Sequence, residues 1–315
     1  MGQFYTTNYK QILDGLSIPD NVNYIIEPFA GSGDLLKFLT DDNERYGDIA
    51  VECYDIDPKQ SYIKQRDTIK EPPIYKNKFV LTNPPFLARN KSKNKTLYDK
   101  YSVNDLYKCF IKELITNSPN GGIIIIPLNF WCSIRKSDIE LKRAFLTKFK
   151  VIRVNVFEMR VFDDTTSAIS CFQFMLKKNK ENKENDEIQF MIYPSLAYFD
   201  ISFNESNNYL IGGEIYKLPQ NNNIKIDRLT KRNYESKKRF ITNIFVKCLD
   251  DSYESQISMK IVGDDELYVD NTEKLTARSF ATLVIEPEIS MKKQQKLVKE
   301  FNSYLTGMRE KYNSL

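Results

Sequence analysis

The 315-residue chain contains no histidine, and this absence excludes a large part of enzyme chemistry. Serine triads, cysteine–histidine nucleophiles and histidine-ligated metals all need an imidazole, which is also the commonest general base. The five cysteines form no C-x-x-C pair, so neither a zinc site nor a disulfide framework is expected. Chemistry in this chain must therefore use carboxylates, amides, backbone groups or a cofactor, and no metal site is predicted.

Long hydrophobic runs are lacking too. The longest purely aliphatic run, Ile123 to Ile126, is far shorter than the ~20 residues of a membrane-spanning helix, so no membrane partner is expected. The first residues show no basic stretch followed by an apolar segment, which predicts no secretory signal. An odd number of scattered thiols fits a reducing compartment and predicts a cytoplasmic protein.

Neither sign of charge is in large excess, because 46 Lys and Arg residues face 42 Asp and Glu residues. The distribution of charge must therefore decide whether a polyanion binds. Hydrophobic residues make up 41% of the chain, which is enough for a globular core. The length is about twice the ~150-residue expectation for one domain and predicts two.

Short apolar runs alternate with helical patterns through the first half of the chain. Residues 24–26, 49–54, 79–82 and 123–126 have the character of buried strands, and 106–115 carries apolar residues at helical spacing. Buried runs separated by helices predict a parallel, Rossmann-like α/β sheet. Two β-like segments, 167–176 and 188–193, flank a Lys/Asn/Glu tract at 177–187. We interpret that tract as an exposed hairpin loop.

The composition changes after residue 195, where Asn-rich stretches interrupt the chain and the strand–helix alternation is lost. This change predicts a first domain over 1–195 and a smaller second domain over 196–315. The second domain is expected to end in a helix over about 290–312.

A glycine loop and an acid follow the first two predicted strands. Gly31 and Gly33 allow a tight turn and close approach of a ligand. The loop lacks both G-x-G-x-x-G and Gly-Lys-Ser/Thr, so it is a poor phosphate cradle. Asp55 lies 22 residues beyond Gly33, where an acid commonly binds ribose hydroxyls. An ordinary acidic turn before Pro58 is the alternative interpretation of Asp55. Together, the glycine loop and Asp55 favour a nucleoside-containing cofactor without pyrophosphate.

The tetrapeptide Asn83-Pro84-Pro85-Phe86 follows another predicted strand. Two consecutive prolines fix φ twice and remove two N–H donors, so the preceding carbonyl groups face outward unpaired. An amide beside such carbonyls can accept hydrogen bonds from both N–H groups of an exocyclic amine. Phe86 would supply a flat surface for the ring that carries the amine. A plain proline-kinked loop is the alternative interpretation.

In order and spacing, the Glu27–Gly33 loop, the Tyr54–Pro58 segment and the Asn83–Phe86 tetrapeptide resemble the motifs of S-adenosylmethionine-dependent DNA adenine-N6 methyltransferases. The resemblance covers residues 4 to about 176. The sequence Phe4-Tyr5-Thr6-Thr7 is similar to that family's N-terminal Phe-x-Thr-Pro element, with Thr7 in place of proline. A basic region after these motifs is similar to the subgroup whose target-recognition domain is C-terminal.

The resemblance implies S-adenosylmethionine as cofactor and a doubly wound methyltransferase sheet. It further implies direct transfer to the N6 amine of an adenine flipped out of double-stranded DNA. Asp67 lies where the family has an acid contacting the cofactor's adenine amine, and Phe162 lies in a segment similar to its late aromatic motif. The expected catalytic residues are Asn83, Pro84, Pro85, Phe86 and Phe162. The expected cofactor-binding residues are Phe4, Thr6, Glu27, Phe29, Ala30, Gly31, Gly33, Asp55, Ile56, Asp67 and Asn83.

Two stretches rich in Lys and Arg are the expected DNA contacts. Residues 89–100 hold five basic residues and one acid, and residues 225–247 hold eight basic residues and two acids. Such residues would mostly contact phosphates. A solvated basic face is the alternative for either stretch. The residues expected to bind DNA are Arg89, Lys91, Lys93, Lys95, Lys231, Arg232, Lys237, Lys238 and Arg239.

Other functions remain open at this point. A methyltransferase of the same fold acting on RNA or on a protein glutamine amide would need the same tetrapeptide, because each substrate presents an NH₂ group. A non-catalytic nucleic-acid-binding subunit is a further alternative. No cysteine follows a proline, which excludes a carbon-5 cytosine methyltransferase. A separate restriction endonuclease is a candidate partner, in a restriction-modification or viral setting, and the chain could be a monomer or a dimer.

Overall fold

The computed structural model describes residues 6, 8–162, 168–178, 187–211, 223–247, 257–264 and 280–313. The chain divides into two compact units, Met1–Lys217 and Leu218–Leu315. Among the helices that the structure describes, none combines the length and apolar character that a membrane span requires.

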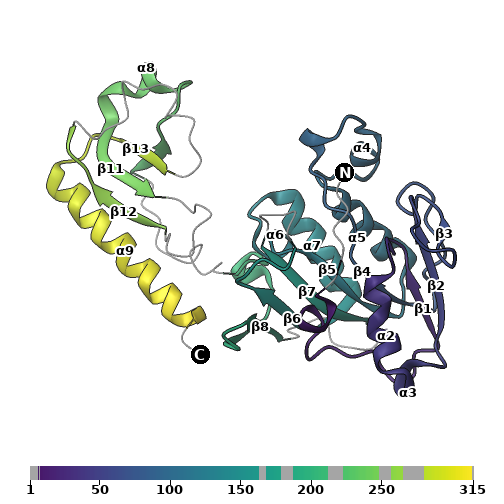
Figure 1. Ribbon diagram of the computed structural model, residues 1–315. Helices are drawn as coiled ribbons and strands as arrows, with labels where there is room; N and C mark the ends of the chain where they lie inside the picture. The colour runs from purple at the N-terminus through teal and green to yellow at the C-terminus, as the bar shows by residue number, and fades with distance from the viewer. Residues whose placement is uncertain are drawn as a thin grey trace. The chain divides into compact units, whose positions relative to one another are not determined.

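The first unit is built on a nine-stranded sheet with the order β3-β2-β1-β4-β5-β7-β6-β8-β9 (Figure 1). Its strands are β1 (Tyr24–Glu27), β2 (Ala50–Asp55), β3 (Lys64–Gln65), β4 (Phe79–Thr82), β5 (Gly121–Pro127), β6 (Phe149–Phe157), β7 (Ile169–Leu176), β8 (Ile188–Tyr193) and β9 (Tyr198–Ile201). Its α-helices are α1 (Tyr9–Ile12), α2 (Lys37–Asp41), α3 (Asn43–Tyr46), α4 (Thr96–Tyr101), α5 (Leu106–Asn117), α6 (Asn129–Cys132) and α7 (Lys136–Lys148). Its described residues also form the short 3₁₀ helices η1 (Asp34–Leu36), η2 (Arg89–Lys91) and η3 (Glu205–Asn207).

The predicted doubly wound α/β sheet is confirmed, although two of its strands, β7 and β9, run opposite to the others. β3, β2, β1, β4 and β5 are parallel, but β7 runs antiparallel between β5 and β6, so the sheet is mixed. The expected hairpin around 177–187 is wrong, because β8 pairs in parallel with β6 rather than with β7. Residues 179–186 of that tract lie outside the described residues.

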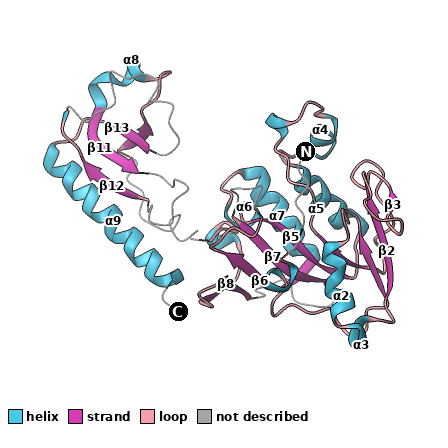
Figure 2. Ribbon diagram, in the orientation of Figure 1, coloured by secondary structure: helices cyan, strands magenta, loops and turns pink. Residues whose placement is uncertain are grey.

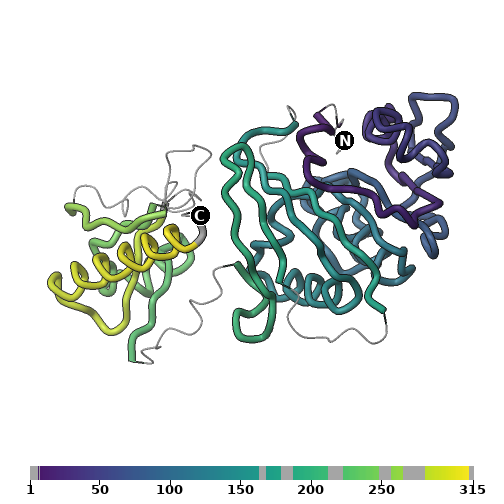
Figure 3. The backbone as a smooth tube through the Cα atoms, turned by 90° about the horizontal axis from the view of Figure 1, so that it is seen from below, coloured from purple at the N-terminus to yellow at the C-terminus, as the bar shows by residue number. Residues whose placement is uncertain are grey.

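Helices cover both faces of this sheet because its central strands are apolar on both sides. Ile123 and Ile125 of β5 pack in one cluster with α1, α2 and α3. Phe172 of β7 pairs with the intervening Ile124 and therefore faces the other side, where its ring meets Phe145 of α7. Figure 3 traces the same strands from below, with the N-terminal segment along one face.

The second unit is a four-stranded antiparallel sheet with a long helix. The strand order is β10 (Lys225–Arg228), β13 (Phe280–Glu286), β11 (Ile241–Lys247) and β12 (Ser258–Ile261). The other elements among the described residues of this unit are α8 (Tyr234–Lys237), the 3₁₀ helix η5 (Lys238–Phe240) and α9 (Met291–Asn313). α9 agrees with the helix expected near the C-terminus (Figure 2).

The two faces of this smaller sheet carry different elements. Leu283 and Ile285 pack with Leu297 and Val298 of α9. The intervening Val284 packs with Tyr234 and Phe240, from the α8–η5 segment, and therefore lies on the opposite face. The basic segment 231–240 and α9 thus cover opposite sides of one sheet.

The observed division between the units falls later in the chain than the predicted boundary at 195/196. The reason is β9, which pairs antiparallel with β8 and so extends the first sheet as far as Ile201. This pairing is long-range information that the change of composition after residue 195 does not carry.

Candidate functional site

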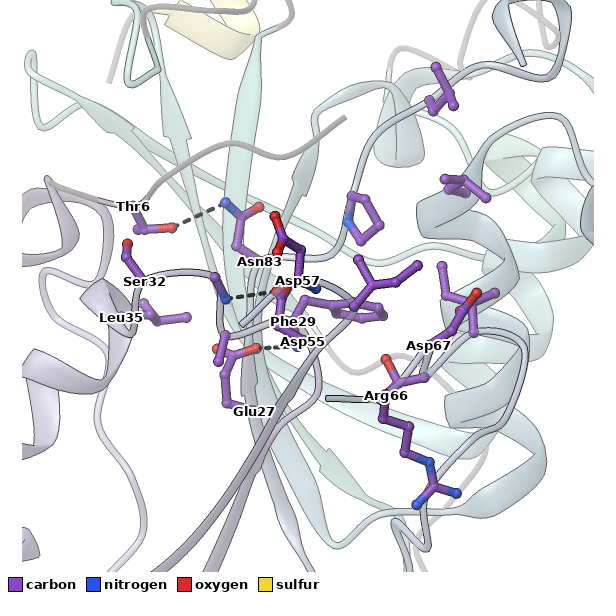
Figure 4. A pocket seen from close by; sticks show the side chains of 18 of the residues that line it. Thr6, Glu27, Phe29, Ser32, Leu35, Asp55, Asp57, Arg66, Asp67 and Asn83 are labelled. Atoms are coloured by element: carbon purple, nitrogen blue, oxygen red, sulfur yellow. Dashed lines mark hydrogen bonds between the residues drawn. The ribbon is translucent and has the colours of Figure 1, made fainter. Parts of the chain in front are cut away.

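The largest set of predicted site residues meets where the strand order of the first sheet reverses. β1 lies beside β2 on one side and beside β4 on the other, and the chain segments that leave these three strands converge there. In open α/β sheets, ligands bind at this edge, outside the carboxyl ends of the strands. A cavity of about 430 Å³ occupies the position, lined by residues from all three segments (Figure 4).

Asp55 ties together the two loops that follow β1 and β2. Its Oδ2 accepts the Gly31 N–H and its Oδ1 accepts the Asp57 N–H, both at 2.8 Å. Gly31 and Gly33 have φ values of 54° and 83°, a left-handed conformation that glycine adopts without strain. Asp55 therefore holds the glycine turn against the loop that follows β2, at the wall of the cavity.

Glu27 ends β1 and is almost completely buried at the wall of the cavity. Its Oε1 accepts hydrogen bonds from the Phe29 N–H, at 3.0 Å, and from the Thr82 hydroxyl. Its Oε2 is buried and has no hydrogen-bond partner among the residues that the structure describes. Burial raises the pKa of Glu27 to about 8, because the charged form is poorly solvated. Such an oxygen is suited to a cationic or hydrogen-bond-donating group of a ligand.

Asn83 follows β4 directly and lines the cavity next to Thr6. Its Nδ2 donates to Thr6 Oγ1 at 3.1 Å. Figure 4 shows the amide nitrogen turned toward Thr6 and the amide oxygen on the other side of the group. Pro85 also lines the cavity, whereas the Phe86 ring meets Tyr107 edge to face, with 6.1 Å between the centroids.

The opposite end of the cavity is apolar with polar groups at its edge. Ile69, Leu87, Leu97 and Leu106 form the apolar wall. Asp67 lies at this end, and its Oδ1 accepts the Lys70 N–H at 3.1 Å. A cavity lined by both carboxylates and leucine side chains matches a ligand that has a polar and a flat apolar part.

The structure brings ten of the predicted residues to this cavity and leaves others away from it. Those that line it are Thr6, Glu27, Phe29, Ala30, Gly31, Asp55, Ile56, Asp67, Asn83 and Pro85. Gly33, Pro84, Phe86 and Phe162 are not part of its lining. Phe162 is buried in the hydrophobic cluster against which Phe86 packs. Phe4 lies outside the described residues.

Ten lining residues were missed by the sequence analysis. They are Ser32, Asp34, Leu35, Asp57, Arg66, Thr68, Ile69, Leu87, Leu97 and Leu106. Ser32 and Asp57 lie within the two loops that the sequence already identifies, and Leu87 directly follows the tetrapeptide, so their positions carried a signal. Leu97 and Leu106 lie in helices that dock from elsewhere, and no local pattern marks them. No group of three or more His, Cys, Asp or Glu side chains in the described ranges is arranged to hold a metal ion.

The predicted DNA-binding residues lie in two separate places. Arg89, Lys91, Lys93 and Lys95 belong to the first unit and directly follow the tetrapeptide; Arg89 pairs with Asp99 at 2.8 Å. In the second unit, Lys237 is ion-paired with Glu286. The exposed basic residues of that segment are Lys231, Arg232, Lys238 and Arg239.

No family model matches the chain, and no curated protein sequence matches it. Several solved structures are similar at low identity. One is assigned as the modification subunit of a type I restriction enzyme from Vibrio vulnificus YJ016, at 14% identity and a TM-score of 0.46, covering 61% of this chain and 47% of that one. Another is assigned as a class I S-adenosylmethionine-dependent methyltransferase from Listeria monocytogenes, at 13% identity and a TM-score of 0.44, covering 60% and 62%.

A third is the methyltransferase subunit of a type I restriction-modification system from Streptococcus thermophilus, at 15% identity and a TM-score of 0.44, covering 70% of this chain and 55% of that one. The chain therefore spans between about half and three fifths of the length of these three proteins. The similar structures thus include type I restriction-modification methyltransferase subunits and an S-adenosylmethionine-dependent methyltransferase. These are similarities at low identity, and the residues of the cavity carry the functional proposal.

Proposed function

We propose that this chain is a DNA methyltransferase that transfers a methyl group from S-adenosylmethionine to the N6 amine of a flipped-out adenine. The observation that carries the proposal is the meeting of Asn83, the Gly31 loop and Asp55 around one cavity at the switch point of the sheet. A restriction-modification or viral setting, with a separate endonuclease, is part of the proposal.

The chemistry of the residues that line the cavity supports this cofactor. The buried Glu27 Oε2 suits a cationic group, and Asp55 can accept ribose hydroxyls. The adenine end of the cofactor would lie among the leucine side chains near Asp67, where Ile56 is 57% exposed although apolar and can cover a flat ring. When bound, S-adenosylmethionine supplies an electrophilic methyl group.

The tetrapeptide would then prepare the target amine. The lone pair of an exocyclic amine is conjugated into its ring, so the amine is a poor nucleophile. Hydrogen bonds from its two N–H groups to the Asn83 amide oxygen and the Pro84 carbonyl would shift the nitrogen toward sp³ geometry, and orientation supplies much of the remaining rate. Phe86 is the proposed stacking surface for the flipped base. Phe162, expected on the other side of the base, is buried in the hydrophobic cluster and does not offer its ring to a ligand.

Methyl transfer from labelled S-adenosylmethionine to unmethylated genomic DNA tests this function, with tRNA and total protein as parallel acceptors. We expect label in DNA, recovered after digestion as N6-methyladenine. If label were found only in RNA or in protein, S-adenosylmethionine would remain the cofactor, but DNA would be wrong as the substrate. Cofactor binding without label in any acceptor would point to a missing partner subunit. Failure to bind S-adenosylmethionine would favour the non-catalytic subunit instead.

Replacing Asp55 with alanine is expected to weaken S-adenosylmethionine binding by about 1–3 kcal/mol, the range for leaving buried hydrogen-bonding groups unpaired. The Gly31 N–H would lose its acceptor at the same time. Isothermal titration calorimetry measures the change. Asp57→Ala is the matched control, because Asp57 is a neighbouring acid that lines the same cavity. Normal binding by Asp55→Ala and loss in Asp57→Ala would transfer the ribose role to Asp57.

The exposed basic side chains of residues 231–240 are the proposed phosphate contacts of the second unit. Joint replacement of Lys231, Arg232, Lys238 and Arg239 by alanine is expected to weaken DNA binding. The slope of log affinity against log salt concentration is negative, and each lost phosphate contact should reduce its magnitude by about 0.9. Fluorescence anisotropy of labelled duplex DNA at several salt concentrations measures both.

A control removes the same charge from the other side of the same sheet. Lys292, Lys293, Lys296 and Lys299 are exposed on α9, and their joint replacement by alanine should leave the salt slope near the wild-type value. Equal slopes for the two variants would mean that net charge alone, rather than the 231–240 segment, determines affinity.

A further inference from the structure

The chain segment that leaves the tetrapeptide is held against the start of α5. The Arg89 N–H donates to the Asn104 carbonyl at 2.8 Å, and the Leu106 N–H donates to the Leu87 carbonyl at 3.2 Å. These bonds join two segments that both contribute to the apolar wall of the cavity, through Leu87 and Leu106. The position of that wall therefore depends on how firmly the two segments are joined.

Asp105 strengthens this junction with its side chain. It occupies the N-cap position of α5 and forms an isolated antiparallel bridge with Ala88. Its Oδ1 accepts the Leu87 N–H at 3.0 Å, while the Tyr98 hydroxyl donates to the Leu87 carbonyl at 2.9 Å. Both backbone polar groups of Leu87 are thus bonded to groups from α4 and α5 or their flanks.

A buried ion pair makes the start of α5 a rigid support. Lys108 and Asp138, which are almost fully buried, are paired at 2.8 Å and join α5 to α7. Lys108 Nζ also donates to Asn104 Oδ1 at 2.8 Å, and the Ser133 hydroxyl donates to Asp138 Oδ2 at 2.6 Å. Asn104 is therefore fixed to the core of the first unit. Because Asp105 follows Asn104 directly, its hydrogen bond to the Leu87 N–H holds Leu87 in place as well.

We infer that Asp105 is a positioning residue for the cofactor, which acts by fixing Leu87 at the apolar end of the cavity. The inference rests on the proposed function, because it takes S-adenosylmethionine as the ligand whose flat ring meets this wall. Without the Asp105 acceptor, the Leu87 N–H loses its protein partner and the segment after the tetrapeptide can move away from α5. The cofactor would then lose its apolar contact with Leu87, although the substituted residue, Asp105, does not itself line the cavity.

Titration of S-adenosylmethionine into four variants of the full chain tests the role of Asp105. Asp105→Ala is expected to bind about tenfold more weakly than the wild type, because it removes one hydrogen bond to a half-buried N–H group. Asp105→Asn keeps an acceptor oxygen and is expected to bind within about twofold of the wild type. Asn94→Ala is the matched control, since Asn94 Oδ1 accepts the Thr96 N–H at 2.9 Å in the same region without reaching Leu87; it should bind as the wild type does.

Tyr98→Phe provides a second route to the same segment if Asp105→Ala fails to fold. It keeps the buried ring and removes only the hydroxyl that holds the Leu87 carbonyl, and about threefold weaker binding is expected. Wild-type affinity in folded Asp105→Ala and Tyr98→Phe would overturn the positioning role, as would an Asp105→Asn variant as weak as Asp105→Ala. A wild-type chain that binds no S-adenosylmethionine would overturn the proposed function itself, so the two failures are distinguishable.

Discussion

Asn83→Ala should lose methyl transfer by at least about 10²- to 10³-fold, the range for removing one preorganised hydrogen-bonding group from an active site. The variant lacks the amide oxygen proposed to accept a hydrogen bond from the target amine. Cofactor affinity should change little, because the groups proposed to bind the cofactor most strongly, Glu27 and Asp55, remain in place. Single-turnover transfer to DNA and calorimetric titration of S-adenosylmethionine measure the two quantities separately.

Asn83→Asp is the matched control for this prediction. It keeps the shape of the side chain and an acceptor oxygen, but it loses the donor that bonds Thr6 Oγ1 at 3.1 Å. We expect it to retain more transfer than Asn83→Ala, because acceptors for the amine remain. If Asn83→Ala instead lost cofactor affinity and transfer in equal measure, Asn83 would belong to the cofactor site alone, and the proposed role of the tetrapeptide would be wrong.

Much of the central sheet could be predicted because its strands carry their own signal. The apolar run 79–82 coincides with β4, and the run at 123–126 lies within β5. Pairing between distant strands could not be predicted in the same way. β8 follows β7 in the chain, yet it pairs with β6, and nothing local in the Ile188–Tyr193 sequence distinguishes these two partners. The later division between the compact units has the same origin, since β9 joins a sheet whose other strands lie earlier in the chain.

The residues of the candidate site show the same difference between local and long-range information. Glu27, Asp55 and Asn83 could be predicted because each ends or follows a buried strand, and carboxyl ends of parallel strands meet at one edge. The apolar wall could not be predicted, because Leu97 and Leu106 reach the cavity only through the docking of α4 and α5. That docking depends on specific contacts such as the buried pair of Lys108 and Asp138, which no spacing in the sequence announces.

Glu27→Gln is expected to change both the pH dependence of stability and the protonation that accompanies cofactor binding. Burial raises the pKa of Glu27 to about 8, against an ordinary value of 4.5 for a glutamate. The folded protein therefore favours the protonated carboxyl. Its contribution to stability is fully present below about pH 4.5 and is lost as the pH rises through about 8. Glutamine has no such titration, so the variant should become more stable than the wild type as the pH rises across this window.

Chemical denaturation of both proteins without cofactor, at pH 5 and pH 8, measures this difference. An advantage for the variant of more than about 1 kcal/mol at pH 8 is expected, since each pKa unit corresponds to about 1.4 kcal/mol. An advantage that does not grow with pH would mean that Glu27 stays ionised in the folded protein.

Cofactor binding should reverse the preference for the protonated carboxyl. A cationic group of S-adenosylmethionine beside the buried Oε2 would favour the carboxylate, so binding near pH 7 is expected to release up to about one proton from the wild type. Calorimetry in two buffers with different ionisation enthalpies measures that proton, and Glu27→Gln should bind more weakly without a dependence on the buffer. Because the glutamine keeps nearly the same shape, a buffer dependence that persists in the variant would assign the proton to another group. If neither protein showed a dependence on the buffer, the cofactor's cationic group would lie away from Glu27.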